Sequence, residues 1–575
     1  MRLEALLNRW RYGEDRERIE FLTSQLLQFL QTSTDSTNNA QNKAPNNATT
    51  SDARWDGSTC VLITYGDAVQ TPNEASLVTL RTLLDRHFGA LANTVHVLPF
   101  LKASSDGGFA VASHERLEEH LGGWEDLKAL SQGRQLMADL VLNHVSAAHP
   151  WVQQFRQGQT PGVDCVLAPD PNDDWSQVVR PRSTNLFTAF QTQTGLRPVW
   201  TTFGPDQVDV NWDCDAVLLA YAALLNRMVA HGVGWLRLDA VGFVWKEPGS
   251  TCIHHPRAHL LVKVLRALLE GMDPQGVVVT ETNVPERENL SYLTPGDEAH
   301  LAYNFPLPPL LLDAVLREKA DLLNGWLQRW PSLPNATNLL NFSASHDGVG
   351  LRPLEGLMDQ ERLAQLLEQC ELRGGLVSHR RLSDGRDQPY ELNISWWAAM
   401  ADAGRDPHHL QRERFLLSQL LVMALPGIPA FYLPTVLASG NDAATFRRSG
   451  HRRDLNRERF SAEALERQLT DPDSDASHNL RWLQHAMAVR AALPAFHPDA
   501  AMQCIGERQS DRVILQRGCG ASSLWAVHNI TAHRINLDLR TLANRSQWCD
   551  RLRDQTDIPT LLTLNPFAVH WLQPC

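Results

Sequence analysis

The chain has 575 residues, of which 43% are hydrophobic and 21% charged, and its formal net charge is −12. This is the composition of an ordinary globular protein, long enough for about two to four domains. The acidic balance and the absence of a concentrated basic tract argue against a nucleic-acid partner. The N-terminus MRLEALLNRW has no apolar signal segment, and no run approaches the roughly 18 apolar residues of a membrane span. We therefore expect neither secretion nor a membrane partner.

The cysteine pattern predicts free thiols. There are nine cysteines, an odd number, spread from Cys60 to Cys575 without a repeating spacing. Such a pattern is typical of a reducing compartment, so we predict a cytoplasmic protein. Cys252, His254 and His255 could bind a metal, but this CxHH motif lacks a second ligand pair. We therefore predict no metal and no other cofactor.

The first part of the chain predicts a helical extension. Residues 1–30 carry apolar side chains at helical spacing. Residues 31–57 are rich in Thr, Ser and Asn and nearly empty of large apolar side chains, which is typical of a mobile linker. We therefore predict an N-terminal helical extension and flexible linker over 1–58. The helical positions are Leu3, Leu6, Leu7, Trp10, Ile19, Leu22, Leu26, Leu27 and Phe29.

From residue 60 onward, short apolar strands alternate with amphipathic helices such as 216–231, 257–271 and 411–425. Eight such units predict an α/β fold, a closed parallel (β/α)8 barrel, over residues 59–493. The predicted strands are Val61–Tyr65, Thr94–Phe100, Gln135–Leu142, Val233–Asp239, Val277–Glu281, His300–Phe305, Asn338–Ser343 and Ile428–Leu433.

Three connections are too long for plain loops: an insertion at 145–214 after strand 3, an insertion at 348–400 after strand 7, and 434–459 after strand 8. Long loops at the carboxyl ends of barrel strands build active sites. After about residue 494 the apolar pattern changes to period two, which predicts an antiparallel β-domain over 494–575. Its predicted strands are Val513–Gln516, Ser523–His528, Ile535–Leu539 and Phe567–Leu572.

The segment Gly234–Trp245, GWLRLDAVGFVW, places two charges on a buried strand. Arg237 and Asp239 lie two residues apart, so they point to the same side. Burying two charges costs several kcal/mol unless they pair or a ligand uses them. This strand alone leaves two interpretations equally open, a structural ion pair and an ionised nucleophile.

Other polar residues also occur where predicted strands end. Three carboxylates at one face suit glycoside cleavage, because one attacks the anomeric carbon, one protonates the leaving oxygen and one stabilises the oxocarbenium-like charge. A single strand-end Asp is often only a helix cap or an ion pair, but four motifs in this order favour a catalytic site. The motif residues are Asp139, Asn143, His144, Arg237, Asp239, Glu281, His346 and Asp347.

The ordered motifs ADLVLNH, WLRLDAVGF, TETN and ASHD resemble the α-amylase family, glycoside hydrolase family 13. The segments VLITYGD, VHVLPFLKASSDGGF, RLDAVGFVWKEPGSTCIH, ASHDGVGLRPLEG, LPGIPAFY and RDLNR resemble its sucrose phosphorylase subfamily, from about residue 60 to the C-terminus. The resemblance implies a metal-independent, retaining double displacement in which phosphate takes up a glucosyl unit.

The resemblance also implies roles for individual residues. Asp239 is the expected nucleophile, Glu281 the acid/base and Asp347 the stabiliser of the transition state. The residues expected to hold the glucosyl unit are Asp106, Phe109, His144, Phe203, Gln207, Arg237, His346 and Arg453.

Departures from the subfamily pattern concern the acceptor. Asn283 stands where plain sucrose phosphorylases have a His, and TETNVP, WKEPGSTCIH, LRPVWTTFGPDQVDVN and the N-terminal extension resemble glucosylglycerate phosphorylases. Phosphate and a carboxylate acceptor both favour fork-shaped cationic donors. Loop arginines can equally be plain surface residues. The candidates for the phosphate and acceptor site are Arg180, Arg182, Asn283, His379, Arg380 and Arg381, with Arg386 in the same insertion.

These observations favour an α-glucoside phosphorylase acting on glucosylglycerate, with a small-molecule α-glucoside and inorganic phosphate as partners and a monomer or homodimer as the assembly. Sucrose, sucrose 6'-phosphate or glucosylglycerol is an alternative substrate. A hydrolase or transglucosidase is an alternative enzyme. A non-catalytic amylase-fold subunit is a third class, disfavoured because Asp239, Glu281 and Asp347 are all present.

Overall fold

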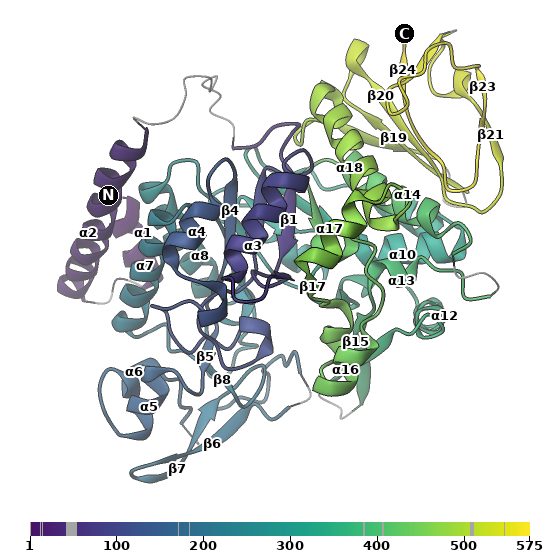
Figure 1. The fold of residues 1–575 in the computed structure, drawn as a ribbon. Helices are drawn as coiled ribbons and strands as arrows, with labels where there is room; N and C mark the ends of the chain where they lie inside the picture. Colours follow the sequence, from purple (N-terminus) through teal and green to yellow (C-terminus); the bar gives the residue numbers. More distant parts are fainter. Residues whose placement is uncertain are drawn as a thin grey trace.

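The computed structural model describes residues 2–11, 13, 15–41, 54–170, 172–182, 184–382, 386–404, 408–506, 511–545 and 547–575. For residues 32–41 and for Arg381 it describes the backbone alone. Figure 1 shows a central barrel, with a helical hairpin from the N-terminus on one side and the C-terminal β-sheets on another. Residues 42–53 of the predicted linker lie outside the described residues.

Eight parallel strands form the closed barrel, as the sequence predicts. The order around the barrel is β1-β16-β12-β11-β10-β9-β4-β3, and β3 closes onto β1. Every strand residue except Gln135 is buried, because helices cover the outside and side chains fill the inside. The strands are β1 (Val61–Thr64), β3 (Thr94–Val97), β4 (Gln135–Val141), β9 (Val233–Asp239), β10 (Val277–Thr280), β11 (Leu301–Tyr303), β12 (Asn338–Phe342) and β16 (Ile428–Tyr432).

Amphipathic helices surround the barrel (Figure 1). Helix α8 begins where the His255 side chain accepts a hydrogen bond from the Arg257 backbone N–H, and Pro256 occupies its first turn. Within the described part of the chain, no helix is both long and apolar enough to cross a membrane. The helices are α3 (Ser76–Leu83), α4 (Trp124–Leu130), α7 (Asp215–Ala230), α8 (Pro256–Met272), α9 (Glu286–Leu290), α10 (Leu307–Arg317), α11 (Asp321–Leu327), α14 (Gln411–Ala424) and α18 (Asp475–Ala492).

Three long connections extend from the carboxyl ends of the strands. After β4, strand β5 pairs antiparallel with β8 and a hairpin forms from β6 and β7. After β12, strands β13, β15 and β14 form a small sheet. The connection after β4 contains β5 (His144–Ser146), α5 (Pro150–Arg156), α6 (Gly162–Cys165), β6 (Phe187–Thr192), β7 (Gly195–Trp200) and β8 (Gln207–Asp209). The connection after β12 contains β13 (Val349–Gly350), α12 (Gln360–Glu371), β14 (Leu376–Arg381), β15 (Asp387–Asn393) and α13 (Trp396–Ala399). After β16 come α15 (Leu433–Val436), α16 (Ala443–Ser449), β17 (Phe460–Ser461), which pairs with β2 (Val69–Gln70), and α17 (Ala462–Thr470).

The N-terminal helices α1 (Arg2–Trp10) and α2 (Arg16–Gln41) pack on α8 and α7. Trp10 is fully buried, with its ring 6.5 Å from that of Trp212 and 6.2 Å from that of Trp245. The prediction that the linker begins at residue 31 is wrong, because α2 continues to Gln41. Ser, Thr and Asn disfavour a helix only weakly, so an established helix extends through them.

The C-terminal region forms antiparallel sheets, as predicted. A five-stranded sheet has the order β18-β19-β20-β24-β22, and β21 pairs with β23. The period-two pattern identifies four of these seven strands, and the boundaries of the domains themselves stay predictions. The strands are β18 (Met502–Ile505), β19 (Arg512–Arg517), β20 (Leu524–Asn529), β21 (Ile535–Asp538), β22 (Trp548–Asp550), β23 (Leu561–Leu564) and β24 (Val569–Pro574).

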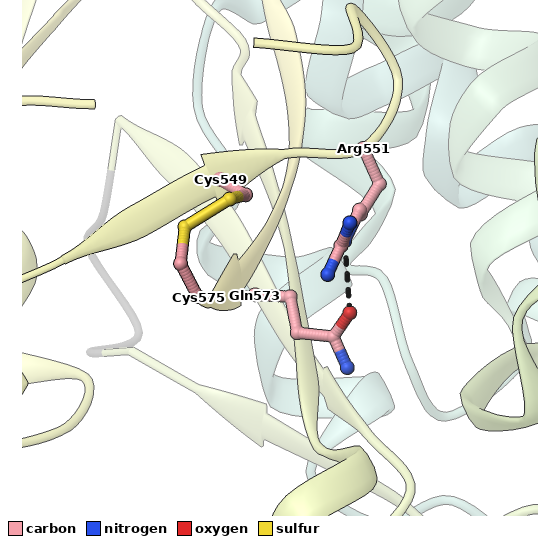
Figure 2. The surroundings of a disulfide bond; sticks show 4 residues. All are labelled: Cys549, Arg551, Gln573 and Cys575. Atoms are coloured by element: carbon pink, nitrogen blue, oxygen red, sulfur yellow. Dashed lines mark hydrogen bonds between the residues drawn. A yellow bond between two sulfur atoms is a disulfide. The ribbon is translucent and has the colours of Figure 1, made fainter. Parts of the chain in front are cut away.

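The prediction of free thiols throughout is wrong for two cysteines. Cys549 and Cys575 form a disulfide, with their Cα atoms 5.7 Å apart (Figure 2). Strand β22 runs antiparallel to β24, with Cys549 opposite Gln573, so the end of the chain lies beside Cys549. Cysteine spacing cannot show this strand pairing. The free cysteines of the described residues are Cys60, Cys165, Cys214, Cys252, Cys370, Cys504 and Cys519.

Candidate active site

Three carboxylates meet around Arg237 at the carboxyl ends of the barrel strands. Asp239 is the last residue of β9, Glu281 follows β10, and Asp347 lies in the loop after β12. Arg237 Nη1 donates to Asp239 Oδ1 at 2.7 Å, and Nη2 lies 3.8 Å from Glu281 Oε1 and 3.7 Å from Asp347 Oδ2. Nη1 also donates to Asp139. One buried guanidinium therefore neighbours all the predicted catalytic groups.

The chain turns sharply directly after Asp239. Ala240 adopts a left-handed conformation with φ 49° and ψ 29°, which is unfavourable for a residue other than glycine. Its backbone N–H donates to Glu281 Oε2 at 3.1 Å. This turn therefore links the ends of β9 and β10 and fixes the carboxyl group of Glu281 beside the end of Asp239's strand.

Burial and charge set the protonation of this carboxylate pair. Burial raises the pKa of Glu281, and the charge of Arg237 opposes this only in part. Burial also raises the pKa of Asp239, with Arg237 again opposing it. The charge of Glu281 also raises the pKa of Asp239, so the pair binds a proton more readily than isolated carboxyls would. Because Arg237 hydrogen-bonds Asp239 and stands farther from Glu281, we place the negative charge on Asp239 and the proton on Glu281.

Asp347 is held in its charged form by Arg453. Burial acts to raise the pKa of Asp347, but the charges of Arg453 and Arg237 outweigh it and bring the pKa well below its usual range. Arg453 Nη1 lies 2.6 Å from Asp347 Oδ1. The same guanidinium donates to the Glu391 carboxylate through Nη2 at 2.7 Å and Nε at 3.0 Å. Asp347 is thus a fixed anion beside the carboxylate pair.

These groups line a pocket that holds about 810 Å³ of empty space, part of it open to solvent. Of the residues predicted to hold the glucosyl unit, six line its wall. Gln207 Nε2 donates to Asp106 Oδ2 at 3.0 Å, and His144 Nε2 lies 3.1 Å from the Phe109 carbonyl oxygen. Burial lowers the pKa of His144, so its imidazole is neutral. The six are Asp106, Phe109, His144, Phe203, Gln207 and Arg453.

His346 stacks on Phe109, with ring centroids 5.2 Å apart and planes inclined by 6°. Burial brings the pKa of His346 well below its usual range, so the ring is neutral. Neither of its nitrogens makes a hydrogen bond to the described residues, although Nε2 lies 3.6 Å from Asp347 Oδ1. A buried ring nitrogen without a partner is costly, and the hydroxyl of a bound sugar would satisfy it.

Gly107 allows the loop that carries Asp106 to approach the barrel. A Cβ at this position would lie 2.8 Å from both Arg457 Nη1 and Tyr65 Oη, and φ is +61°. Only glycine combines this backbone conformation with this close approach. Arg457 in turn donates through Nε to the His346 carbonyl oxygen at 2.9 Å, so the Asp106 and His346 loops are fixed to each other.

The predicted phosphate and acceptor residues separate into two groups. Arg182 and Asn283 line the pocket, and the Arg182 guanidinium lies 5.7 Å from the centre of the Tyr390 ring. Arg180 instead donates to the Thr184 carbonyl and His379 is exposed.

Two arginines of the insertion after β12 complete that set. Arg380 is half-buried and pairs with Glu355 at 2.7 Å, away from the pocket wall. The side chain of Arg381 lies outside the described residues.

Sequence reasoning did not identify several pocket residues as functional. Arg352 lies in the quoted motif ASHDGVGLRPLEG, and Tyr390 and Glu391 lie at the end of the quoted insertion 374–391. An arginine five residues after Asp347, on a loop that leaves the active-site face, is a signal that could have found Arg352. The pocket residues not predicted from the sequence to bind substrate include Phe243, His254, Phe305, Arg352, Tyr390 and Glu391, of which His254 was considered only as a metal ligand.

The side chains of the CxHH motif have separate partners. His254 Nδ1 lies 2.9 Å from Tyr292 Oη, and His255 Nε2 lies 3.0 Å from Glu247 Oε2. Among the described residues, no group of three or more His, Cys, Asp or Glu side chains is arranged to hold a metal ion.

Comparison with known proteins agrees with this geometry. A family model described as the catalytic domain of alpha amylase matches residues 90–348. The glucosylglycerate phosphorylase of Allomeiothermus silvanus is 40% identical over 479 residues, which is 83% of this chain and 86% of that protein. The chain belongs to the α-amylase family, in its sucrose phosphorylase subfamily. The resemblance drawn from the motifs is thereby confirmed.

Two further relatives show how far the similarity within the α-amylase family extends. The glucosylglycerate phosphorylase of Escherichia coli is 35% identical over 523 residues, covering 90% of this chain and 92% of that one. The sucrose phosphorylase of Bifidobacterium adolescentis is 27% identical over 437 residues, covering 72% of this chain and 82% of that one. The similarity to the first of these relatives includes most of the chain, so it is not confined to the barrel.

A solved structure supports the α-amylase fold. The crystal structure of sucrose 6F-phosphate phosphorylase from Thermoanaerobacter thermosaccharolyticum superposes with a TM-score of 0.71 at 22% identity, covering 82% of this chain and 94% of that one. Together with the closed barrel, this confirms the predicted fold class.

Proposed function

We propose that this α-amylase family chain is a retaining α-glucoside phosphorylase that converts 2-O-α-D-glucosylglycerate and phosphate to α-D-glucose 1-phosphate and D-glycerate. The observation that carries the proposal is the pocket itself. Its wall holds Asp239, Glu281 and Asp347, which lie around Arg237, and also the cation of Arg182. The similarity to two glucosylglycerate phosphorylases supports glycerate as the acceptor.

In the first half of the reaction, an oxygen of Asp239 attacks the anomeric carbon while Glu281 gives its proton to the glycosidic oxygen. The bond to that oxygen breaks, D-glycerate leaves, and a glucosyl ester of Asp239 remains. Asp347 stabilises the positive charge that develops on the ring, because Arg453 keeps its carboxylate anionic. The preorganised charges require little rearrangement during this step.

In the second half, a phosphate oxygen attacks the same carbon and the ester bond to Asp239 breaks. Glu281, now ionised, takes the proton that the attacking phosphate oxygen carries. Two inversions give net retention, so the product is the α-anomer of glucose 1-phosphate. Arg182 favours phosphate over water here, since a guanidinium binds an oxyanion strongly.

The glucosyl unit would be held by the neutral imidazoles of His144 and His346, the carboxylate of Asp106 and the ring of Phe109. Neutral imidazoles can both donate to and accept from sugar hydroxyls.

The monomeric or homodimeric state and the cytoplasmic location stay predictions. The disulfide between Cys549 and Cys575 is unusual for a reducing compartment, so quantifying free thiols in protein alkylated inside cells tests that location.

A product assay tests the proposed function. The protein is incubated with 2-O-α-D-glucosylglycerate with and without phosphate, and glucose 1-phosphate, glucose and glycerate are measured over time. We expect glucose 1-phosphate and glycerate in equal amounts, with little glucose, and we expect turnover to require phosphate. Glucose release at the same rate without phosphate would identify a hydrolase, and turnover of sucrose but not glucosylglycerate would identify another phosphorylase.

A further inference from the structure

Arg352 is a buried cation that lacks a strong partner among the described residues. It is the first residue of a short 3-10 helix, Arg352–Leu354, directly after β13, it lines the pocket, and it is 9% exposed. Its guanidinium makes no hydrogen bond to the described residues, and its ion pair with Glu355 is 3.8 Å long. Glu355 is already bound by Arg380 at 2.7 Å, so one carboxylate faces two guanidinium groups.

Such a cation is stable only if something compensates for its burial. Removing a guanidinium from water costs several kcal/mol unless an anion accepts its hydrogen bonds. The positive charges of Arg182 and Arg352 both line the pocket, whereas Glu391 beside them is bound by Arg453. Among the described residues, neither Arg182 nor Arg352 therefore has a carboxylate within hydrogen-bond distance, and a bound anion is the group that would pair with them.

The two arginines share one region of the pocket with the acid. Burial raises the pKa of the Tyr390 hydroxyl, the charges of Arg182 and Arg352 lower it, and that of Glu281 raises it. Tyr390 is next to the strand that positions Arg352, because the Leu351 N–H donates to the Tyr390 carbonyl at 3.0 Å. An anion bound by Arg352 would therefore lie near the group that protonates the leaving oxygen.

The position of Arg352 in the pocket suits a 2-hydroxycarboxylate acceptor. In 2-O-glucosylglycerate the carboxylate is attached to the same carbon as the glycosidic oxygen. When Glu281 reaches that oxygen, the carboxylate is therefore held within a few bonds of it. A cation that recognises the acceptor must share the pocket with the acid, as Arg352 does.

Asn283 supplies a second polar group at this place. Its Oδ1 is buried and has no hydrogen-bond partner among the described residues. The side chain packs against Gly350, where a Cβ would lie 2.3 Å from Oδ1. Gly350 thus makes room for the Asn283 amide, whose free oxygen can accept a hydrogen bond from an acceptor hydroxyl.

We propose that Arg352 binds the carboxylate of a 2-hydroxycarboxylate acceptor and that Asn283, seated against Gly350, accepts a hydrogen bond from its terminal hydroxyl. This inference rests on the proposed function and assigns the acceptor part of the same pocket. It makes Arg352 a specificity-determining residue, whereas the carboxylates of the glucosyl site serve every acceptor.

The test compares two acceptors in the reverse direction. Glucose 1-phosphate is supplied with D-glycerate or with glycerol, and kcat/KM is measured for each with the wild type, Arg352→Gln and the control Arg447→Gln. Arg447 is exposed on α16, so the control removes one positive charge away from the pocket. We expect Arg352→Gln to lower the ratio of glycerate to glycerol by about 10- to 100-fold, through a higher KM for glycerate, and the control to keep the wild-type ratio.

A second variant covers the case in which Arg352→Gln does not fold. Arg352→Lys keeps the positive charge but loses the guanidinium fork, so it should also raise the KM for glycerate more than that for glycerol. Gly350→Ala pushes the Asn283 amide aside and should raise the KM for both acceptors, because both carry a terminal hydroxyl. An unchanged ratio in folded Arg352→Gln, or in Arg352→Lys where Arg352→Gln does not fold, would overturn the role of Arg352, and an unchanged KM for both acceptors in Gly350→Ala would overturn that of Asn283. Failure of the proposed function looks different, because the wild type itself would then form no phosphate-dependent product.

Discussion

Arg237 Nη1 donates a hydrogen bond to Asp239 Oδ1 across 2.7 Å, between two residues that follow each other on one face of β9. From the strand alone, a structural ion pair and a catalytic nucleophile are equally good interpretations. The structure shows an ion pair whose acid faces the pocket. The same guanidinium that compensates for the burial of Asp239 also favours its ionised form, so one contact serves both stability and nucleophilicity.

Replacing the nucleophile should abolish turnover without unfolding the protein. Asp239→Asn keeps the shape of the side chain, but an amide cannot form the glucosyl ester, so we expect kcat to fall by roughly 1,000-fold or more. The measurement is steady-state phosphorolysis, with circular dichroism as the control for folding. A fluorinated glucosyl donor should label Asp239 in the wild type, and labelling of another residue would refute this role.

Glu281 should determine the alkaline limb of the pH profile. It acts as an acid only while protonated, and burial raises its pKa, so kcat/KM should decline as pH rises through that raised pKa. Glu281→Gln should remove this limb and lower phosphorolysis by about 100- to 10,000-fold. α-Glucosyl fluoride, whose leaving group needs no proton, should lose far less activity, and an equal loss with both donors would exclude the acid role.

Glu391 should stabilise the protein at neutral pH and not in acid. Burial acts to raise the pKa of Glu391, but Arg453 outweighs it and the pKa is lowered. The stabilisation is therefore complete above the ordinary carboxyl pKa and is lost as pH falls through the lowered one. Glu391→Gln should reduce the free energy of unfolding by roughly 1.5–3 kcal/mol at pH 7. Thermal melts between pH 7 and pH 3 should show the wild type and variant converging in acid, and a constant difference would contradict the assignment.

Arg182 should determine the affinity for phosphate. Arg182→Ala removes a pocket cation, so we expect the KM for phosphate to rise by about 10- to 100-fold while hydrolysis of the donor changes much less. Arg180→Ala is the matched control, because its guanidinium donates to the Thr184 carbonyl instead of lining the pocket. Arg381→Ala tests in the same way an arginine of the insertion after β12. Equal losses of phosphorolysis and hydrolysis in Arg182→Ala would mean that Arg182 only supports the fold.

The N-terminal hairpin should contribute to the stability of the barrel. Trp10 is fully buried between rings of Trp212 and Trp245, so Trp10→Ala should cost roughly 3–5 kcal/mol. Phe21→Ala, on the same hairpin at 54% exposure, should change the free energy of unfolding by about 0.5 kcal/mol or less. Denaturant melts measure both, and similar small effects would show that the hairpin is only loosely attached.

Local patterns predict some of these features and not others. The eight barrel strands can be predicted from the sequence because each is a short apolar run between helices. The carboxylates can be predicted because they stand where those runs end. The pairing of Arg453 with Glu391 cannot be predicted in this way, because Glu391 lies in β15 and Arg453 lies 62 positions later, in the connection after β16. Arg352 was missed for a related reason, since its burial and its missing partner are properties of the folded pocket.

Two other features depend on the chain beyond its local pattern. The extension of α2 to Gln41 depends on a helix already formed on α7 and α8, because its last residues are weak helix formers. The disulfide between Cys549 and Cys575 depends on the pairing of β22 with β24. In both cases the contacts that decide the structure are made with residues distant in the sequence, so local composition gave the wrong prediction.

An acceptor competition tests the central claim most directly. Glucose 1-phosphate is offered to the wild type with equal concentrations of D-glycerate, glycerol, fructose and fructose 6-phosphate, and the glucosylated products and released phosphate are quantified. We predict that glucosylglycerate is the main product and that glycerol is used about 10- to 100-fold less well, because only glycerate has a carboxylate for the pocket arginines. Equal use of glycerol or fructose, or a preference for fructose 6-phosphate, would contradict glycerate as the acceptor.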